Sequence, residues 1–552
     1  MWSSTSSVIR LTAENTLEKT TLDRGAYLAA KREAKKAVFK AKSDGYKAVY
    51  DMLDTREGER AMYRLVRARH RSTLDMEHTK IVKGADGAVL RRSGQILERW
   101  REYYNHLCNE EFCHPPIPTV PSVEGPVLPI TASHAKRSRV RVATLFNKIV
   151  AKGRTPDVWQ TSVTVPVWKW KEDIADCTSY RPIRLLCHTM KVFERVLEAR
   201  LWKIVSVSLN QCGFVKDCST IDAIHAVRIL LEKHREKNRS VHLTFLDLEK
   251  AFDRVPHELL WMSMRSHRVP EEYVPWTKLL YAKPTSVVRC AAGTSRSFPV
   301  QVESASVDFT LCRRCHAHVG SRDDPQKQVQ SWKDQLRQYG LRLNTSKTEY
   351  MECGPRTEDG SIRVDGTELN KVNCFKYLGS KVTSTGDIDQ EGRARVNAAW
   401  MKWKMATGRT VVPPVTLYGC ECWPTKKALE RVLHAMEMRM LRGTIGVTLK
   451  EKVSNDTVRS IFGIVPITEK MKEARLRWLG HVLWREEDSV AKTALKLDVS
   501  GVRSRGRPKI RWLDRVKLDM IDARLCTADA MDRTKWKTRS RKADPATTRD
   551  KR

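Results

Sequence analysis

The 552-residue sequence lacks any apolar run of the ~18 residues that a helix needs to cross a bilayer. Its first residues also lack the charged start and apolar core of a signal peptide. The 14 cysteines follow no repeating spacing, and the chain shows no internal repeat. These absences argue against a membrane-spanning protein and a secreted disulfide scaffold. We therefore expect an intracellular protein with reduced thiols, in the nucleus or the cytoplasm.

Acidic residues are also scarce, because 65 Asp and Glu face 101 Lys and Arg, which gives a formal net charge of +36. The excess of positive charge runs from end to end, so it indicates a general attraction to polyanions and no single localisation tag. This balance favours nucleic acid as the partner, and a generic basic protein is the alternative. The length leaves room for roughly two to four domains, each with its own core.

The composition changes along the chain. Apolar residues recur at helical spacing through the basic residues 26–75, whereas the proline-rich stretch 115–129 cannot hold a helix and is expected to be a linker. Helices alternate with short strands to about residue 385, and a mainly helical pattern follows over 415–482. Residues 483–552 are basic and poorly patterned, and we expect the chain after Lys535 to be disordered.

One predicted strand ends on a carboxylate. The stretch VHLTFLDL at 241–248 has the apolar residues of a buried strand, but Asp247 lies at its end. A carboxylate at the end of an apolar strand costs free energy unless it binds a cation or a hydrogen-bond donor. We therefore expect Asp247 to hold such a group. Asp253 precedes Pro256, so a capping or turn role suits Asp253 better than metal binding.

Several stretches carry recognisable motifs. They are SYRPIRLL (179–186), NQCGFVKDCSTIDAI (210–224), FLDLEKAFDRV (245–255), GLRLNTSKTEYM (340–351), CFKYLGSKV (374–382), LYGCECW (417–423) and RLRWLGHVLWRE (475–486). In this order they resemble the polymerase core of reverse transcriptases from non-LTR retrotransposons, and the nearest resemblance is to the RTE/BovB-like group. The agreement extends over much of the chain after residue 179.

The resemblance implies an α+β fold of the right-hand polymerase type, with an incomplete palm sheet and a helical thumb. We expect the upstream endonuclease domain that is usual in such elements to be absent, because the sequence begins in basic helices. The expected regions are a basic helical linker region (1–114), a Pro-rich linker (115–130), fingers (131–240), an incomplete palm (241–385), a thumb-like helical region (386–490) and a basic, disordered C-terminal tail (491–552).

The reaction implied by the resemblance is RNA-directed DNA synthesis. A primer 3′-hydroxyl displaces pyrophosphate from a dNTP, with two Mg²⁺ ions ~3.5–4 Å apart on the reacting oxygens. Asp247 would bridge the two ions, since Mg²⁺ prefers oxygen ligands, and Lys347 would protonate the pyrophosphate. Arg181 would contact the incoming triphosphate, and Phe252 would exclude a nucleotide 2′-hydroxyl. By themselves, Phe252 suits a core and Lys347 suits a solvated surface.

The resemblance also implies an RNA template and a DNA primer or target DNA as partners. The motif at 210–224 would lie along the template, and the motif at 374–382 would form the hairpin that grips the primer. The residues implied for these contacts are Gln211, Gly213, Phe214, Tyr377, Leu378 and Gly379.

The second metal-binding motif of the family, Tyr-Ala-Asp-Asp on an apolar strand, does not occur in the sequence. Asp323 and Asp324 lie in a polar stretch, which favours a helix start or a solvated turn. With suitable codons, residues 310–317 (TLCRRCHA) become Leu-Tyr-Ala-Asp-Asp-Val-Met-Leu in the next reading frame. The same frame shift explains the zinc- or haem-like spacing of Cys312, Cys315, His316 and His318 without a metal. Residues 129–148 also lack the family's Lys-Ala-x-Gly-Pro-Asp segment.

These departures predict a degenerate or mis-spliced copy with impaired polymerase activity, because the second Mg²⁺ ion is poorly held. One alternative is a non-catalytic relic that still binds nucleic acid. An active enzyme and a relic without a cellular role are the others.

The C-terminal region contains a further motif. Arg505, Arg507 and Lys509 lie in the sequence RGRPK, which resembles the core of an AT-hook that enters the minor groove of A·T-rich DNA. The alternative is an ordinary basic loop, with Trp512 packed against the helix predicted at 477–482.

Overall fold

The computed structural model describes residues 81–109, 113–131, 139–169, 173–208, 211–212, 215, 218–249, 255–300, 314–319, 323–354, 362–405, 412–503, 506 and 509–541. The basic helices predicted at 26–75 lie outside the described residues. The chain divides into two compact units, and the described part of the first comprises 81–103, 163–185 and 287–297. In the ranges above, no helix is both long and apolar enough to cross a bilayer.

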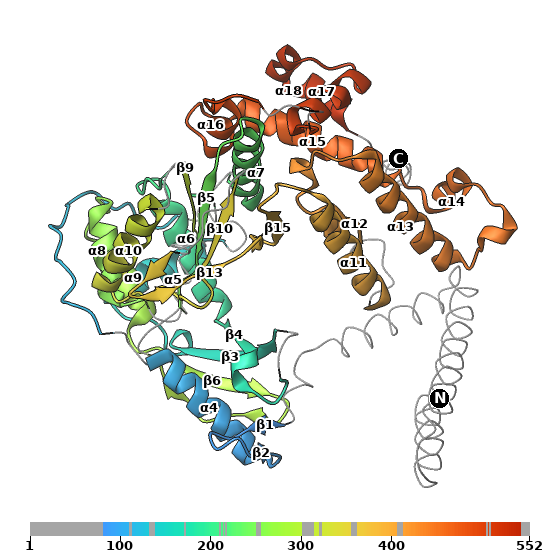
Figure 1. Cartoon of the computed structure of the whole chain (residues 1–552). Coiled ribbons are helices and arrows are strands. Elements are labelled where there is room, and N and C mark those ends of the chain that lie inside the picture. Colours follow the sequence, from blue (N-terminus) through green and yellow to red (C-terminus); the bar gives the residue numbers. More distant parts are fainter. Residues whose placement is uncertain are drawn as a thin grey trace, which may run out of the picture. The chain divides into compact units, whose positions relative to one another are not determined.

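One sheet has the strand order β4-β3-β6-β7, and β8 pairs with β6. Strand β4 is antiparallel to β3, with Arg181 opposite Val167. Tyr180 is buried at the start of β4, and its ring packs edge-on against Trp100 of α4, with 5.0 Å between ring centroids. This aromatic pair attaches α4 to the sheet, and Figure 1 shows α4 beside the strands of that sheet. The bounds are β1 Val82–Lys83, β2 Val89–Leu90, α4 Ser93–Asn109, β3 Thr161–Trp168, β4 Tyr180–Leu185, β6 Thr285–Cys290, β7 Gly293–Thr294 and β8 Phe298–Pro299.

The second unit contains a sheet of strand order β13-β10-β5-β9. Strand β5 (Val241–Leu246) pairs antiparallel with β10 (Glu349–Cys353) on one side and with β9 (Arg314–Val319) on the other. Strand β13 (Asn370–Lys371) runs parallel to β10. All residues of β5 are buried. The predicted buried strand before Asp247 is therefore confirmed, and it lies in the interior of its sheet.

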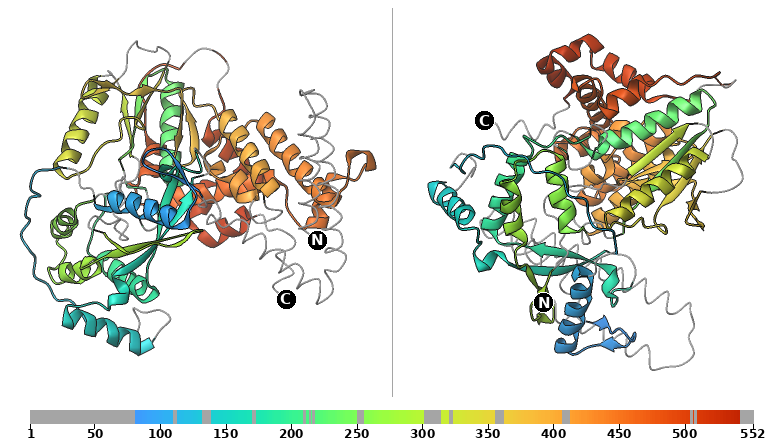
Figure 2. Two further views of the ribbon diagram at one scale, coloured as in Figure 1. Left: turned by 90° about the horizontal axis from the view of Figure 1, so that it is seen from below. Right: turned by 90° about the vertical axis from the view of Figure 1, so that its left-hand side faces the viewer.

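Helices cover the two faces of this sheet. Helix α7 (Thr220–Glu236) packs its apolar residues against Leu243 and Phe245 of β5. Leu246 points to the opposite face, where it shares a core with Val329 of α10 (Asp323–Gln338). This alternation follows from the period of two in a strand. Figure 2 shows α7 in green beside the strands.

A separate helical core lies in the same unit. Its helices are α5 Arg139–Lys152, α6 His188–Leu201, α8 His257–Ser266 and α9 Tyr273–Lys278, and aromatic side chains such as Phe146, Trp159 and Phe193 fill its centre. The proline-rich stretch before α5 contains no helix, as predicted. It is also hydrogen-bonded to this core, because Arg200 donates to the carbonyl oxygens of Leu128 (2.6 Å) and Pro129 (2.8 Å).

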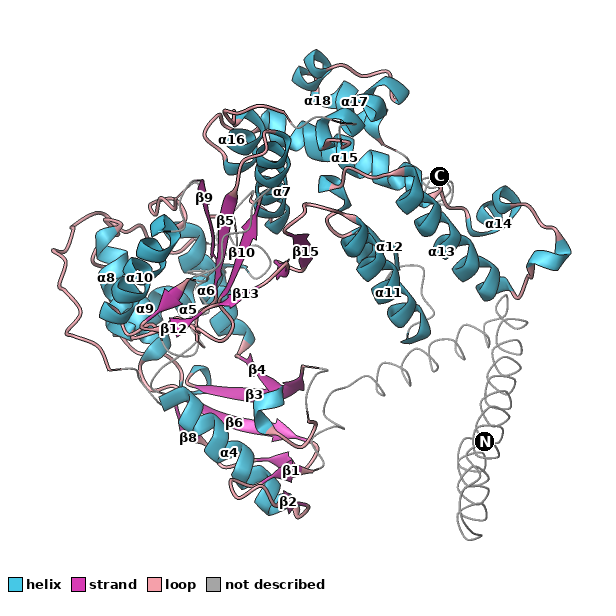
Figure 3. Ribbon diagram, in the orientation of Figure 1, coloured by secondary structure: helices cyan, strands magenta, loops and turns pink. Residues whose placement is uncertain are grey.

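The region after residue 385 is mainly helical, as its sequence predicts (Figure 3). The helices are α11 Asp389–Met405, α12 Val412–Leu417, α13 Lys427–Ile445, α14 Asn455–Phe462 and α15 Ile467–Trp484. Four short strands precede this region: β11 Arg363–Val364, β12 Thr367–Glu368, β14 Cys374–Tyr377 and β15 Ser380–Thr383. The 3₁₀ turns before and within it are η2 Asp157–Trp159, η3 Cys177–Ser179, η5 Leu279–Tyr281, η6 Cys420–Cys422 and η7 Leu449–Glu451.

The expectation of disorder after Lys535 is wrong for the described residues. Helix α18 (Arg533–Ser540) follows α16 (Val490–Lys496), α17 (Trp512–Asp522) and the 3₁₀ turn η8 (Thr527–Met531). Trp536 of α18 is fully buried, and its indole N–H donates to the carbonyl oxygen of Leu476 in α15 at 3.0 Å. Trp512 belongs to the same apolar cluster, as the packing alternative predicted. Burial of these large indoles offsets the polar composition of the segment.

Candidate active site

Asp247 directly follows β5 and is half-buried. Its backbone N–H donates to the hydroxyl of Thr348 at 3.2 Å, and its carbonyl oxygen accepts from the backbone N–H of Asn344 at 2.8 Å. One residue beyond Leu248, the N–H of Glu249 donates to the carbonyl oxygen of Arg342 at 2.9 Å. The end of the strand is therefore fixed by the segment 342–348, which enters β10.

Lys347 lies in that segment and is exposed. Its backbone N–H donates to the side-chain oxygen of Asn344 at 3.1 Å, which closes the turn around the Asp247 carbonyl contact. Main-chain hydrogen bonds thus bring Asp247 and Lys347, which are far apart in the sequence, to the same end of the paired strands β5 and β10. The motif at 340–351 pointed to Lys347. It did not indicate that Asn344 and Thr348 form hydrogen bonds with the backbone of Asp247. The catalytic roles of Asp247 and Lys347 stay predictions.

A strand lies where the sequence predicted a gap in the sheet. In the register of β5 and β9, Arg314 is opposite Leu246 and Cys315 is opposite Phe245. The expectation of an incomplete sheet is therefore wrong at this position. The physical reason is that main-chain N–H and C=O groups pair along a strand edge whatever the side chains are. The residue opposite Leu246 is an arginine, and the shifted reading frame would place an aspartate there.

The described residues do not fit a two-metal site. Asp247 supplies a carboxylate, but within the described ranges no three His, Cys, Asp or Glu residues are grouped so that they could hold a metal ion. Mg²⁺ binds through hard oxygen ligands, and arginine offers none. Asp323 begins α10, which confirms the predicted helix start. The Mg²⁺ site implied by the resemblance is thus incomplete in these residues.

The hairpin predicted at 374–382 is present, and its role in primer binding stays a prediction. Strands β14 and β15 pair antiparallel, with Tyr377 opposite Ser380, and Leu378 and Gly379 form the turn. Both turn residues have positive φ, 47° and 88°, which is the pattern of a two-residue type I′ hairpin turn. The hairpin packs on the strand that leads to Asp247, because the rings of Phe375 and Phe245 stack with 3.9 Å between centroids.

The remaining predicted residues belong to other segments of the sequence. Arg181 is exposed on β4 in the first unit. Gln211 is half-buried, and its backbone N–H donates to the carbonyl oxygen of Ser208 at 2.9 Å. Lys509 is exposed shortly before α17. The others, Gly213, Phe214, Phe252, Arg505 and Arg507, lie outside the described residues.

The comparisons with known proteins agree with these motifs. Residues 169–302, which include Asp247, match the family described as reverse transcriptase (RNA-dependent DNA polymerase). The chain is 23% identical over 364 residues to the RNA-directed DNA polymerase from the mobile element jockey of Drosophila melanogaster, which covers 55% of this chain and 40% of that protein. It is 22% identical over 344 residues to the Pol polyprotein of the type-1 retrotransposable element R2 of Nasonia vitripennis, which covers 54% of this chain and 33% of that protein.

The chain thus spans less than half the length of either relative. A solved structure of telomerase from Candida Tropicalis, in complex with a fragment of telomeric RNA, covers 65% of this chain and 68% of its own. The TM-score of 0.31 and the identity of 10% are too low to establish a common fold.

Proposed function

Because this chain carries a reverse transcriptase domain related to the RNA-directed DNA polymerases of non-LTR retrotransposons, we propose that it binds primed nucleic-acid templates without extending them efficiently. Membership of the RTE/BovB-like group is part of the proposal. The residues proposed to act by descent are Asp247 and Lys347 in catalysis, Arg181 and Phe252 in nucleotide binding, and Gln211, Gly213, Phe214, Tyr377, Leu378 and Gly379 in template and primer binding.

The main support for the proposal is the register in which β9 pairs with β5. Phosphoryl transfer by two Mg²⁺ ions depends on carboxylates that hold both ions at the reacting oxygens. Arg314 is paired opposite Leu246, one residue from Asp247, and it cannot replace a carboxylate ligand. With a single palm carboxylate, the second ion is poorly held, and the rate of nucleotide incorporation falls by orders of magnitude.

Two features support retained binding. The hairpin 374–383 and the segment that carries Lys347 are both packed on the β5 region, so the surface beside Asp247 keeps its backbone framework. The net charge of +36 favours phosphate backbones over any small neutral ligand.

The test combines binding and extension on the same samples. A DNA primer annealed to an RNA template is titrated with the full chain, and nucleotide incorporation is followed with Mg²⁺ and with Mn²⁺. We expect saturable binding by the wild type and by Asp247→Ala, with no incorporation above background in either. Incorporation by the wild type that disappears in Asp247→Ala would overturn the proposal, because another carboxylate would then complete the site.

A further inference from the structure

The turn of the 374–383 hairpin is held by side chains from outside the hairpin. The hydroxyl of Tyr418 donates to the carbonyl oxygen of Leu378 at 2.6 Å, and the guanidinium of Arg395 donates to the carbonyl oxygen of Gly379. The same guanidinium lies over the Tyr418 ring, 4.7 Å from its centroid. Tyr418 and Arg395 therefore support each other while each holds one carbonyl of the turn. We call these two side chains the turn clamp.

The turn clamp is itself held in place. Glu391 lies one helical turn before Arg395 in α11 and accepts from its Nε at 2.7 Å. The same buried carboxylate accepts from the backbone N–H of Lys381 at 2.7 Å and from the hydroxyl of Ser380 at 3.2 Å. From α7, Arg228 donates to the Ser380 hydroxyl at 2.9 Å and to the Lys381 carbonyl oxygen at 2.8 Å. Two helices thus fix the strand that leaves the turn.

The turn also carries backbone strain. Leu378 has a φ of 47°, a left-handed conformation that costs a residue with a Cβ atom free energy, whereas asparagine and glycine are the usual choices in such turns. Strained residues persist where the surrounding structure over-determines them, and they concentrate at binding and catalytic sites. Here the hydrogen bonds of the turn clamp hold the turn in this strained conformation.

The strained turn is connected to the strand of Asp247. Phe375 stacks on Phe245 at 3.9 Å, and Tyr377 lies 5.5 Å from the same ring, measured between centroids. Phe245 precedes Asp247 by two residues. A fixed hairpin therefore has a fixed position relative to the end of β5.

We propose that Tyr418 and Arg395 are positioning residues that hold the 378–379 turn so that the hairpin seats the 3′ end of a primer strand beside Asp247. This inference rests on the proposed function. The competing explanation is that the same contacts only stabilise the fold.

The experiment uses the full chain and a primer that carries 2-aminopurine at its 3′ end, annealed to an RNA template. Affinity is measured for the primed template and for the unprimed template, and the 2-aminopurine fluorescence is recorded at saturation. The variants are Tyr418→Phe, which removes only the hydroxyl, and Arg395→Lys. Tyr180→Phe is the matched control, because it loses a similar hydroxyl contact within the first unit, 2.7 Å to the carbonyl oxygen of Ile174.

We expect the wild type to prefer the primed template. Tyr418→Phe loses the hydrogen bond to the Leu378 carbonyl oxygen and the 3.2 Å contact with the Thr220 hydroxyl, so it should reduce that preference by ~3- to 10-fold. Arg395→Lys should also reduce the preference for the primed template. Both should change the fluorescence of the terminal base, whereas Tyr180→Phe should change neither quantity.

Two results would overturn the inference. One is an unchanged preference and fluorescence in Tyr418→Phe and Arg395→Lys while the wild type prefers the primed template. The other is a change of both quantities in Tyr180→Phe as large as the change in Tyr418→Phe. A wild type that binds primed and unprimed templates equally would instead contradict the proposed function.

Discussion

At the scale of single residues, His225 shows how burial alone sets a chemical property. Its imidazole lies between the rings of Trp512 and Trp478, at 4.6 Å and 5.7 Å between centroids. Neither ring nitrogen has a hydrogen-bond partner among the described residues. Burial lowers the pKa of His225 to about 3, from an ordinary value of 6.5. The folded protein therefore holds this ring neutral.

This depressed pKa predicts a loss of stability in acid. Between pH 6.5 and pH 3 the unfolded chain binds a proton at His225 that the folded chain does not, so the free energy of unfolding falls as the pH falls. At pH 5 the loss is about 2 kcal/mol for this one group. His225→Phe should remove that contribution, as measured by the difference in urea unfolding free energy between pH 7.5 and pH 5. An identical pH difference in the variant and the wild type would contradict the prediction.

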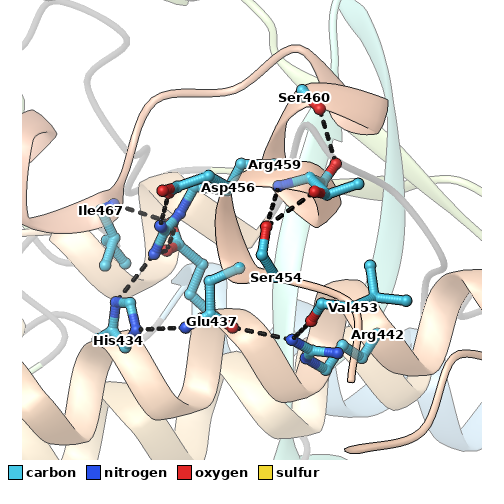
Figure 4. Close-up of polar contacts among 11 residues, drawn as sticks. His434, Glu437, Arg442, Val453, Ser454, Asp456, Arg459, Ser460 and Ile467 are labelled. Atoms are coloured by element: carbon cyan, nitrogen blue, oxygen red, sulfur yellow. Dashed lines mark hydrogen bonds and ion pairs between the residues drawn. The ribbon is translucent and has the colours of Figure 1, made fainter. Parts of the chain in front are cut away.

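At the scale of elements, a buried ion pair lies at the junction of α13, α14 and α15 (Figure 4). Glu437 of α13 accepts from Nε and Nη2 of Arg459 in α14, at 3.2 Å and 2.9 Å. Its other carboxylate oxygen accepts from the backbone N–H of Ile467, the first residue of α15, at 2.8 Å. Burial raises the pKa of Glu437 despite its arginine partner. A single carboxylate thus joins three helices.

Arg459→Met should destabilise the protein by ~3–5 kcal/mol, because it leaves the Glu437 charge buried without its cation. The loss should grow as the pH rises above the raised pKa that Glu437 has in the wild type, since only the ionised carboxylate is uncompensated. The control is Arg459→Met combined with Glu437→Gln, which keeps an oxygen for the Ile467 N–H and should cost clearly less. Urea unfolding of the three proteins checks this. Equal losses in the single and double variants would rule out the buried-charge explanation.

The elements that sequence reasoning found are those with a local signal. The strand before Asp247 and the helix α13 have clear apolar periodicity, and the 374–382 hairpin has a motif. Strand β9 was missed because its sequence, RCHAHV, has no strand-like apolar pattern and forms through main-chain pairing with β5. The helices after residue 511 were missed because their stability comes from a few buried indoles in a basic segment.

The candidate site follows the same rule. Asp247 and Lys347 were recognisable from motifs, whereas the turn clamp brings Arg395 of α11 and Tyr418, which follows α12, to the turn of the 374–383 hairpin. Tyr418 lies in the recognised stretch LYGCECW, but only the fold shows that its hydroxyl reaches the Leu378 carbonyl oxygen. Contacts of this kind depend on tertiary structure, which no local pattern encodes.

At the scale of the whole molecule, the spread of positive charge predicts the character of binding. Neutralised phosphates release counterions, so log affinity should fall linearly with log salt concentration. We expect at least ~10-fold weaker binding at 200 mM than at 50 mM salt, which corresponds to about two or more phosphate contacts. Fluorescence anisotropy with duplexes of different sequence should give similar slopes and affinities. A flat salt response would contradict the prediction.

The central claim is that the chain keeps the framework around Asp247 and lacks the Asp-Asp pair of the second palm motif, whose place residues 311–314 would occupy. The most direct measurement rewrites that stretch as Leu311→Tyr, Cys312→Ala, Arg313→Asp and Arg314→Asp, and follows dNTP incorporation on a primed RNA template with Mg²⁺. We predict incorporation above the wild type that disappears when Asp247→Ala is added. The departure from the family pattern at 129–148 limits the rate but not this dependence on Asp247. A rewritten chain that binds the primed template as the wild type does, yet incorporates nothing, would contradict the claim.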